Sequence, residues 1–122
     1  MTPIAGVGVD AVDVERFGSV LDRRPSIATR LFTEGERRDG AGDVQRLAVR
    51  FAAKEATMKA LGRGIGSVAW HDVEVVRAES GAPSLVLSSS AAILAARRGV
   101  SHWHVSLTHT ATVAVAMVVA EE

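Results

Sequence analysis

Short apolar runs and alternating stretches along the chain predict five β-strands. The run IAGVGV at 4–9 combines β-branched residues with glycine and predicts a buried strand that ends at Asp10. From residue 72 the pattern alternates, and it breaks at SGAP, residues 80–83, which predicts the turn of a hairpin. The expected strands lie at 4–9, 72–77, 84–87, 102–107 and 113–119, the last two joined by a tight link at 108–112.

The segments between these strands show the periodicity of helices. Asp13 is a suitable N-cap for a first helix, while Asp43 and Gly62 are the natural start and stop of the longest one. The expected helices lie at 14–22, 44–61 and 88–98, and residues 26–42 are expected to be irregular except for a short helical turn near 34–38. We therefore expect a single α+β domain over residues 1–122, with a long central helix packed on a mainly antiparallel sheet.

Composition narrows the class of protein. The chain has 122 residues, of which 48% are hydrophobic, so it can build a core without covalent links. It contains no cysteine, which excludes disulfides, thiolate metal sites and cysteine nucleophiles. The amino terminus lacks the features of a secretory signal, and no run approaches the roughly 20 apolar residues of a membrane helix. We expect a cytoplasmic protein with no membrane association.

The charges are unevenly placed although the net charge is zero. Most of the basic residues fall in less than half of the chain, namely Arg16, Arg23, Arg24, Arg30, Arg37, Arg38, Arg46, Arg50, Lys54, Lys59 and Arg63. Such an asymmetry suggests an anionic partner for one face. The alternative is a solvated surface with ion pairs, because acidic residues such as Glu34 and Asp39 are interspersed.

Asp10 ends an apolar run in an unusual setting. With the period of two of a strand, it shares a face with Gly6 and Gly8, so that face carries almost no side chain next to the carboxylate. Backbone, another helix or a ligand must therefore come close there. The alternative is that Asp10 simply caps the following helix.

Glu55 is the second unusual carboxylate. The long helix is apolar almost all round, with one stripe of large residues and another of small ones: Leu47, Phe51, Met58 and Leu61, then Ala48, Ala52, Ala56 and Ala60. Glu55 lies between the two stripes, where a carboxylate needs a partner because an unpaired buried charge is costly. That partner is either Lys59, one turn later in a surface pair, or a metal ion.

Two separated carboxylates in a chain without cysteine suggest a hard cation. Magnesium takes one or two protein carboxylates and completes its coordination with water and phosphate oxygens. Arg50, Lys54 and Lys59 recur on the same helix and are candidates to meet the remaining phosphate charge. The combination implies a phosphate-bearing substrate.

The glycine-rich loop GRGIG at 62–66 is neither a Walker loop nor a dinucleotide fingerprint, because it follows a helix instead of leading into one. The helix dipole at this end also has the wrong sign for an anion. Gly62 is explained as a helix stop, and any phosphate contact would come from backbone N–H groups or from Arg63.

A histidine marks the end of the fourth expected strand. His109 lies between Thr108 and Thr110 in the sequence HVSLTHT. In this position it is a candidate to bind a phosphate or to relay a proton, and the alternative is an ordinary turn histidine.

Together these segments resemble the holo-acyl-carrier-protein synthases, the small branch of the phosphopantetheinyl transferase superfamily. The matching segments follow the order of the family and cover nearly the whole chain: GVGVDAVDVERF at 6–17, LFTEGE at 31–36, RFAAKEATMKALGRGIG at 50–66, WHDVEV at 70–75, SGAPSLVL at 80–87 and HVSLTHTATVAVAMVV at 104–119. The combination of GVD with F-x-x-K-E-x-x-x-K is the specific part of the match.

The resemblance implies an activity and a site. The enzyme would transfer the phosphopantetheine group of coenzyme A to a serine of apo acyl carrier protein and release adenosine 3',5'-bisphosphate. Asp10 and Glu55 would hold the magnesium ion, and Lys59 would contact coenzyme A phosphate and assist proton transfer alongside Glu55. The remaining coenzyme A contacts would be Arg50, Gly62, Gly64, Gly66, Pro83, Thr108, His109 and Thr110.

The resemblance also implies partners. The family is typically a homotrimer with active sites between subunits, and its basic first helix docks the acidic carrier protein, here through Arg16, Arg23 and Arg24. The sequence leaves open whether the carrier is of the fatty-acid or the polyketide type.

Two other functions compete with this interpretation. One is an inactive trimer that only docks acidic partners. The other is a nucleic-acid binder that uses the basic half, but neutral net charge and 4% aromatic residues argue against it.

Overall fold

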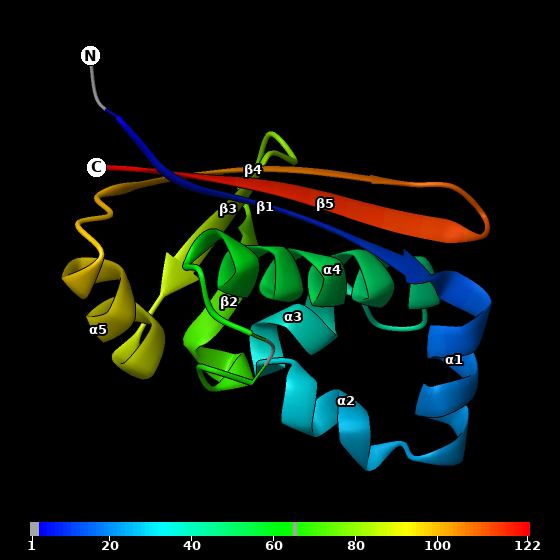
Figure 1. The fold of residues 1–122 in the computed structure, drawn as a ribbon. Coiled ribbons are helices and arrows are strands. Elements are labelled where there is room, and N and C mark those ends of the chain that lie inside the picture. Colours follow the sequence, from blue (N-terminus) through cyan, green and yellow to red (C-terminus); the bar gives the residue numbers. More distant parts are fainter. Residues whose placement is uncertain (1–2, 65) are drawn as a thin grey trace.

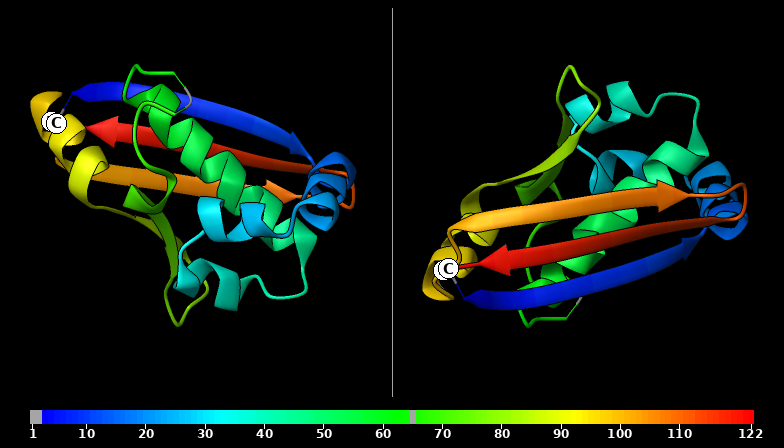
Figure 2. Two further views of the ribbon diagram at one scale, coloured as in Figure 1. Left: turned by 90° about the horizontal axis from the view of Figure 1, so that it is seen from below. Right: turned by 90° about the horizontal axis from the view of Figure 1, so that it is seen from above.

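The computed structural model describes residues 3–64 and 66–122 and shows a sheet with a long helix on one face (Figure 1). The sheet is antiparallel in the order β1-β5-β4, formed by β1 (Ile4–Asp13), β5 (Val113–Glu121) and β4 (His102–His109). Helix α4 (Val44–Ala60) crosses one face at an angle to the strands, and no described helix covers the other face (Figure 2). The predicted α+β fold with a central helix on an antiparallel sheet is confirmed.

Smaller elements surround α4. A separate two-stranded antiparallel hairpin is formed by β2 (Val73–Arg77) and β3 (Pro83–Leu87). The remaining helices are α1 (Val14–Arg23), α2 (Ser26–Leu31), α3 (Glu34–Asp39), the 3-10 turn η1 (Trp70–Asp72) and α5 (Ser89–Arg97). Figure 1 places α1 and α5 at opposite ends of the sheet. None of the described helices is long and apolar enough to cross a membrane.

The glycines of β1 allow α4 to lie directly on the sheet. A Cβ atom added at Gly8 would lie 1.8 Å from the Ala56 carbonyl oxygen, and one at Gly6 would lie 1.9 Å from the Ala60 carbonyl oxygen. The small buried residues of β5 complete this contact: Ala114, Ala116, Val118 and Ala120. The expectation that backbone or a helix approaches the glycine face is therefore confirmed.

Strand β1 is longer than expected. It pairs with β5 through Asp10 and on to Asp13, so Asp10 lies inside the strand and not at its end. The cap of α1 is Asp13, whose carboxylate accepts a hydrogen bond from the Arg16 N–H at 2.8 Å. The alternative that Asp10 caps this helix is wrong, since the strand continues for three residues beyond it.

Helix α2 was not expected in the segment predicted to be irregular. It has only six residues and no side-chain cap, so neither periodicity nor a capping signal identified it. The neighbouring helix α3 does have a signal, because Thr33 and Glu36 form a capping box. The other predicted helices and strands are present within a few residues of their expected ends.

A buried ion pair joins α3 to α4. The Lys54 ammonium lies 2.7 Å from Glu36 Oε1, and both side chains are fully buried. Lys54 also donates to the carbonyl oxygens of Trp70 and Val73, at 2.9 and 2.5 Å, while Glu36 Oε2 accepts from the Val75 N–H. The suggestion that Lys54 meets substrate phosphate is therefore wrong, because its donors are used inside the protein.

Candidate active site

Asp10 and Glu55 come together where α4 crosses β1. Asp10 projects from the glycine face of the strand, and its side chain is 13% exposed. Its Oδ1 accepts a hydrogen bond from the Lys59 ammonium at 3.0 Å, whereas its buried Oδ2 has no hydrogen-bond partner among the described residues. Glu55 reaches the same place from α4 and is buried. The structure thus joins the two carboxylates that the sequence singled out.

The two carboxyl groups are only partly compensated by the Lys59 ammonium. Burial raises the pKa of Glu55 to about 7, and the neighbouring Asp10 carboxylate acts in the same direction, while Lys59 lowers it. Two desolvated carboxyl groups next to each other resist carrying two negative charges. A partly satisfied carboxylate pair of this kind is suited to a hard divalent cation.

The donor set fits magnesium. Asp10 Oδ2 has no hydrogen-bond partner among the described residues, and Glu55 would supply a second oxygen ligand. No group of three or more His, Cys, Asp or Glu residues that would form a closed metal site occurs in the described chain. Two carboxylates alone leave coordination positions open for water and substrate, as magnesium at phosphate-processing sites requires.

Lys59 does not form the surface pair with Glu55 that was one alternative. Its ammonium donates to Asp10 Oδ1 and, at 3.1 Å, to the Val9 carbonyl oxygen. The Lys59 side chain remains 47% exposed. It is therefore able to contact an anionic ligand that lies over the carboxylates.

The glycine loop follows the same end of α4. Gly62 ends the helix with a φ of +74°, and Gly66 has a φ of +85°. A Cβ atom at Gly64 or Gly66 would meet nothing within 4 Å, so both glycines border open space. Ile65, between them, lies outside the described residues. The loop leaves its backbone accessible beside Lys59.

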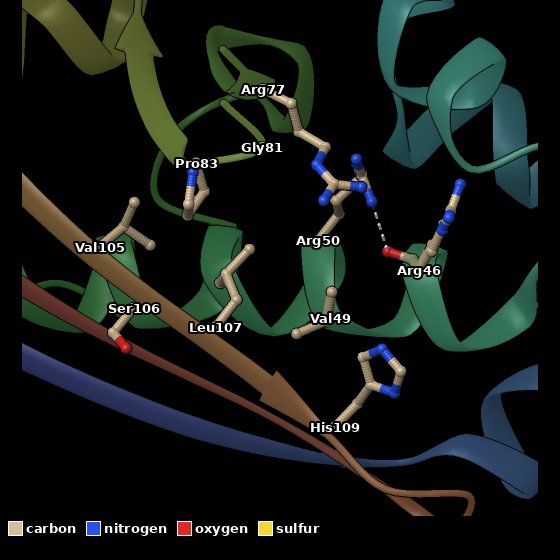
Figure 3. A pocket seen from close by; sticks show the side chains of 10 residues that line it. All are labelled: Arg46, Val49, Arg50, Arg77, Gly81, Pro83, Val105, Ser106, Leu107 and His109. Carbon is tan, nitrogen blue, oxygen red and sulfur yellow. Dashed lines mark hydrogen bonds between the residues drawn. The ribbon is translucent and has the colours of Figure 1, made fainter. Parts of the chain in front are cut away.

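A second candidate region is a cavity of about 390 Å³ on the β4 side of α4 (Figure 3). It is lined by Arg46, Val49, Arg50, Arg77, Gly81, Pro83, Val105, Ser106, Leu107 and His109. Three residues predicted to contact coenzyme A therefore share it, namely Arg50, Pro83 and His109. Arg46 and Arg77 also line the cavity but were not predicted to contact a ligand. The only signal for Arg46 was its place among the unevenly distributed basic residues, and Arg77 had no signal.

The flanking threonines do not line this cavity. Thr110 Oγ1 accepts hydrogen bonds from the N–H groups of Thr112 and Val113, at 3.2 and 3.0 Å. This hydroxyl stabilises the turn between β4 and β5. Thr108 is exposed near the end of β4.

Helix α4 separates the two regions. Arg50 and Glu55 are five residues apart, which is a rotation of roughly 140° around the helix. The lining of the cavity contains neither Asp10 nor Glu55. One chain therefore presents the carboxylate pair and the arginine cavity on different sides.

The first helix and α2 form a third surface. An apolar cavity of about 320 Å³ is lined by Val12, Asp13, Arg16, Phe17, Val20, Ile27, Leu31, Phe51 and Trp70. A neighbouring hollow is lined by Val20, Arg23, Arg24 and Ile27. The three arginines predicted to dock a carrier protein therefore all border hollows on this surface, and only the one at Arg16 is mainly apolar.

Comparison with known proteins gives consistent matches. A family model described as the 4'-phosphopantetheinyl transferase superfamily matches residues 6–118. The holo-[acyl-carrier-protein] synthase of Frankia casuarinae is 56% identical over 118 residues, covering 97% of this chain and 98% of that protein.

Solved structures agree with these matches. The holo-[acyl-carrier-protein] synthase of Neisseria meningitidis superposes with a TM-score of 0.89 at 31% identity, over 98% of this chain and 100% of that one. The Bacillus anthracis synthase, solved in complex with CoA (3',5'-ADP), gives a TM-score of 0.81 at 35% identity, over 99% and 98% of the two chains.

Proposed function

The chain belongs to the 4'-phosphopantetheinyl transferase superfamily, as a holo-acyl-carrier-protein synthase, and we propose that its catalytic centre is the pair Asp10 and Glu55 with a magnesium ion. The enzyme transfers the phosphopantetheine group of coenzyme A to a serine of apo acyl carrier protein. The observation that carries the proposed centre is the buried, unpartnered Asp10 Oδ2 beside Glu55. We take residues 1–122 as one transferase domain that works in the cytoplasm.

Magnesium bound by Asp10 and Glu55 would neutralise diphosphate charge and polarise the phosphorus that carries pantetheine. The protein supplies the rest of the electrostatics. Lys59 lies beside Asp10 with an exposed ammonium, so it is placed to hold the oxygens of the leaving group. The open backbone at Gly64 and Gly66 is placed to take further phosphate oxygens, whereas Gly62 is covered by Arg98 and its N–H donates to the Lys59 carbonyl oxygen.

The chemical step is an in-line displacement at phosphorus. Glu55 accepts the proton of the carrier serine hydroxyl, directly or through a water molecule. The serine oxygen forms a bond to the phosphorus that carries pantetheine as the bond to the bridging diphosphate oxygen breaks. Adenosine 3',5'-bisphosphate leaves, with its new negative charge stabilised by Lys59.

The arginine cavity would hold the rest of coenzyme A. Arg50 is only 2% exposed, yet its Nε has no partner among the described residues, so the cavity presents a desolvated guanidinium. Pro83 offers an apolar surface and His109 a further polar group. Thr108 and Thr110 flank His109 and belong to the proposed site as its neighbours.

A second copy of the chain would complete the active site. Because α4 separates the carboxylate pair from the cavity, a ligand that uses both must lie between two chains. The helix-free face of the sheet exposes Val7, Val9, Val113 and Met117, with exposed fractions of 52, 57, 39 and 48%. Such an apolar sheet face is suited to burial against other copies. We propose a homotrimer with active sites between subunits.

The carrier protein would dock on α1 and α2. Arg16, Arg23 and Arg24 offer positive charge to an acidic protein, and the adjoining hollows offer apolar contacts. This pairing of a charged rim with an apolar centre is typical of specific protein interfaces.

An intact-mass assay tests the proposed function. Apo carrier proteins of the fatty-acid and polyketide types are incubated with coenzyme A, with and without magnesium, and the gain of a phosphopantetheine group is measured. Glu55→Gln should abolish magnesium-dependent transfer and leave the thermal unfolding curve cooperative. Full activity of this variant would remove Glu55 from the mechanism. If the wild type binds the carrier protein but the carrier gains no mass, the alternative of an inactive trimer that only docks acidic partners is favoured.

A further inference from the structure

Helix α2 is held weakly by its own residues. None of its six residues is buried, and its N-cap, Pro25, makes no side-chain hydrogen bond to the helix. Figure 1 shows α2 below α4, on the side away from the sheet. A helix this short is not stable by itself, because few intrahelical hydrogen bonds offset the cost of forming its first turn. Contacts with other elements must therefore fix its position.

A histidine from a distant segment meets the last turn of α2. The carbonyl oxygen of Thr29 is among the last four of this helix, which lack an N–H partner within the helix. His71 in η1 places its Nε2 at 2.7 Å from this oxygen, although the two residues are 42 positions apart. Since a carbonyl oxygen only accepts, Nε2 carries the proton and donates it. His71 thus supplies a C-terminal cap that α2 does not have in its own sequence.

The element that carries His71 is fixed to the interior. The carbonyl oxygen of Trp70 accepts a hydrogen bond from the buried Lys54 ammonium at 2.9 Å. The Trp70 ring packs against that of Phe51 in α4, with ring centroids 5.3 Å apart. On the other side of His71, the Asp72 carboxylate accepts hydrogen bonds from a serine in the first turn of α5. The hydrogen bond from His71 therefore ties α2, through η1, to α4 and α5.

The position of α2 sets the shape of the proposed carrier surface. Ile27 and Leu31 of α2 line the apolar cavity that Phe17 and Val20 of α1 line as well. Ile27 also borders the neighbouring hollow, beside the two arginines at the end of α1. The separation of α1 and α2 therefore decides the width of both hollows. A displacement of α2 would change the surface without touching the carboxylate pair.

We propose that His71 is a positioning residue for the carrier protein: by holding the Thr29 carbonyl it keeps α2 at the distance from α1 that the carrier requires. This inference rests on the proposed function, because it concerns the same docking surface. His71 does not line the cavity that would hold the rest of coenzyme A. Its loss should therefore affect recognition of the carrier protein and not of coenzyme A.

Two substitutions of His71 separate hydrogen bonding from side-chain size. Glutamine places an amide N–H about as far from the backbone as Nε2 of histidine, whereas asparagine is one bond shorter and does not reach Thr29. Loss of the hydrogen bond in His71→Asn should raise the KM for carrier protein about threefold to tenfold and leave the KM for coenzyme A unchanged. His71→Gln should stay close to wild type. Glu79→Gln, at an exposed position of the hairpin turn, is the control for a surface substitution and should match wild type.

The two KM values decide the kinetic test. Equal increases for carrier protein and coenzyme A would overturn the proposal, because they would point to a general loss of structure. Equal values for His71→Asn and His71→Gln would also overturn it, because the hydrogen bond would then have no effect on the carrier protein.

Hydrogen exchange of the protein alone separates this proposal from the proposed function, because it needs neither transfer nor docking. The Phe32 N–H donates to the Ala28 carbonyl oxygen at 3.0 Å across the last turn of α2. This amide should exchange about threefold to tenfold faster in His71→Asn than in wild type, while the amides of α1 should not change. Unchanged exchange in α2 would overturn the proposal even if the carrier protein docks as proposed. If the wild type binds no carrier protein, the docking surface is wrong and this proposal fails with it, and faster exchange would then leave His71 a purely structural role.

Discussion

At the scale of single residues, the carboxylate pair shows how local chemistry depends on an unusual backbone. Glycine at positions 6 and 8 lets α4 approach β1 so closely that Asp10 and Glu55 face each other out of bulk water. Desolvation and the shared negative charge raise the pKa of Glu55 to about 7. The same desolvation strengthens the attraction of both groups for a divalent cation.

This pair predicts a specific pH dependence. In the metal-free folded protein Glu55 keeps its proton up to about pH 7, whereas the unfolded chain releases it near the ordinary value of 4.5. Its contribution to the free energy of unfolding is therefore fully present below pH 4.5 and is lost as the pH rises to about 7. Because the proton competes with the cation, magnesium affinity should rise with pH up to about 7 and then level off.

Thermal unfolding and magnesium titration from about pH 5 to about pH 8 measure both effects. Glu55→Gln cannot titrate and serves as the control. Identical pH profiles for the two metal-free proteins would show that Glu55 does not carry the raised pKa.

Lys54 and Lys59 both lie on α4, but their substitution should affect different properties: Lys54 mainly stability and Lys59 mainly activity. Lys54→Met leaves Glu36 charged and buried without its partner, which should cost about 3 to 5 kcal/mol in the free energy of unfolding. Lys59→Met removes a half-exposed ammonium, so it should cost less than about 1 kcal/mol but sharply reduce transfer. Urea unfolding and the mass assay distinguish them. Comparable stability losses would contradict the assignment of Lys54 to the core and Lys59 to the site.

At the scale of secondary-structure elements, the contact between β1 and α4 is the critical packing feature. It is made by the backbone of both elements, so a side chain has no room to adjust. The contact also sets the distance between the two carboxylates. Structure and chemistry at this crossing therefore depend on the same glycines.

Gly8→Ala tests this dependence. Its Cβ would lie 1.8 Å from the Ala56 carbonyl oxygen, so α4 must move, and we expect a loss of about 3 kcal/mol or more together with weaker magnesium binding. Gly64→Ala is the matched control, because a Cβ there meets nothing within 4 Å and should change stability by less than about 0.5 kcal/mol. The measurement is urea unfolding followed by magnesium titration. A Gly8→Ala protein as stable as wild type would mean that the crossing is loosely packed.

Some elements could be predicted from the sequence and others could not. Helices with an N-cap, such as α1 at Asp13 and α4 at Asp43, were located correctly because the cap signals are local. The six-residue α2 has no such signal, and its formation depends on contacts with its neighbours. The end of β1 was misplaced for a similar reason, since its last residues are held by pairing with β5.

At the scale of the whole molecule, the arrangement of the surfaces predicts dependence on assembly. Met117→Asp places a charge in the centre of the apolar sheet face. If that face is the subunit interface, the variant should have the mass of a single chain by light scattering and should lose transfer activity, because a buried unpaired charge is costly. Ala96→Asp, at an exposed position of α5 away from this sheet face, is a control for an added surface charge. A fully assembled and active Met117→Asp protein would contradict the proposed interface.

Mixed assemblies test whether neighbouring chains share a site. Glu55→Gln removes the carboxylate half and Arg50→Gln the cavity half, so each variant alone should be inactive. When the two are co-expressed, some interfaces join an intact carboxylate pair to an intact cavity, and activity should return. Activity no greater than the sum of the separate variants would place both halves of the site within one chain.

The sequence by itself determined the order and type of most elements, the absence of cysteine chemistry and the two carboxylates of the proposed site. Local patterns indicate these features: apolar periodicity, helix caps, and carboxylates at positions where apolar residues surround them. Tertiary structure decided which charges are available to a ligand, because burial depends on elements distant in the chain. It assigned Lys54 to Glu36 in the interior, brought Arg77 to the same cavity as Arg50, and placed α4 between the carboxylate pair and that cavity.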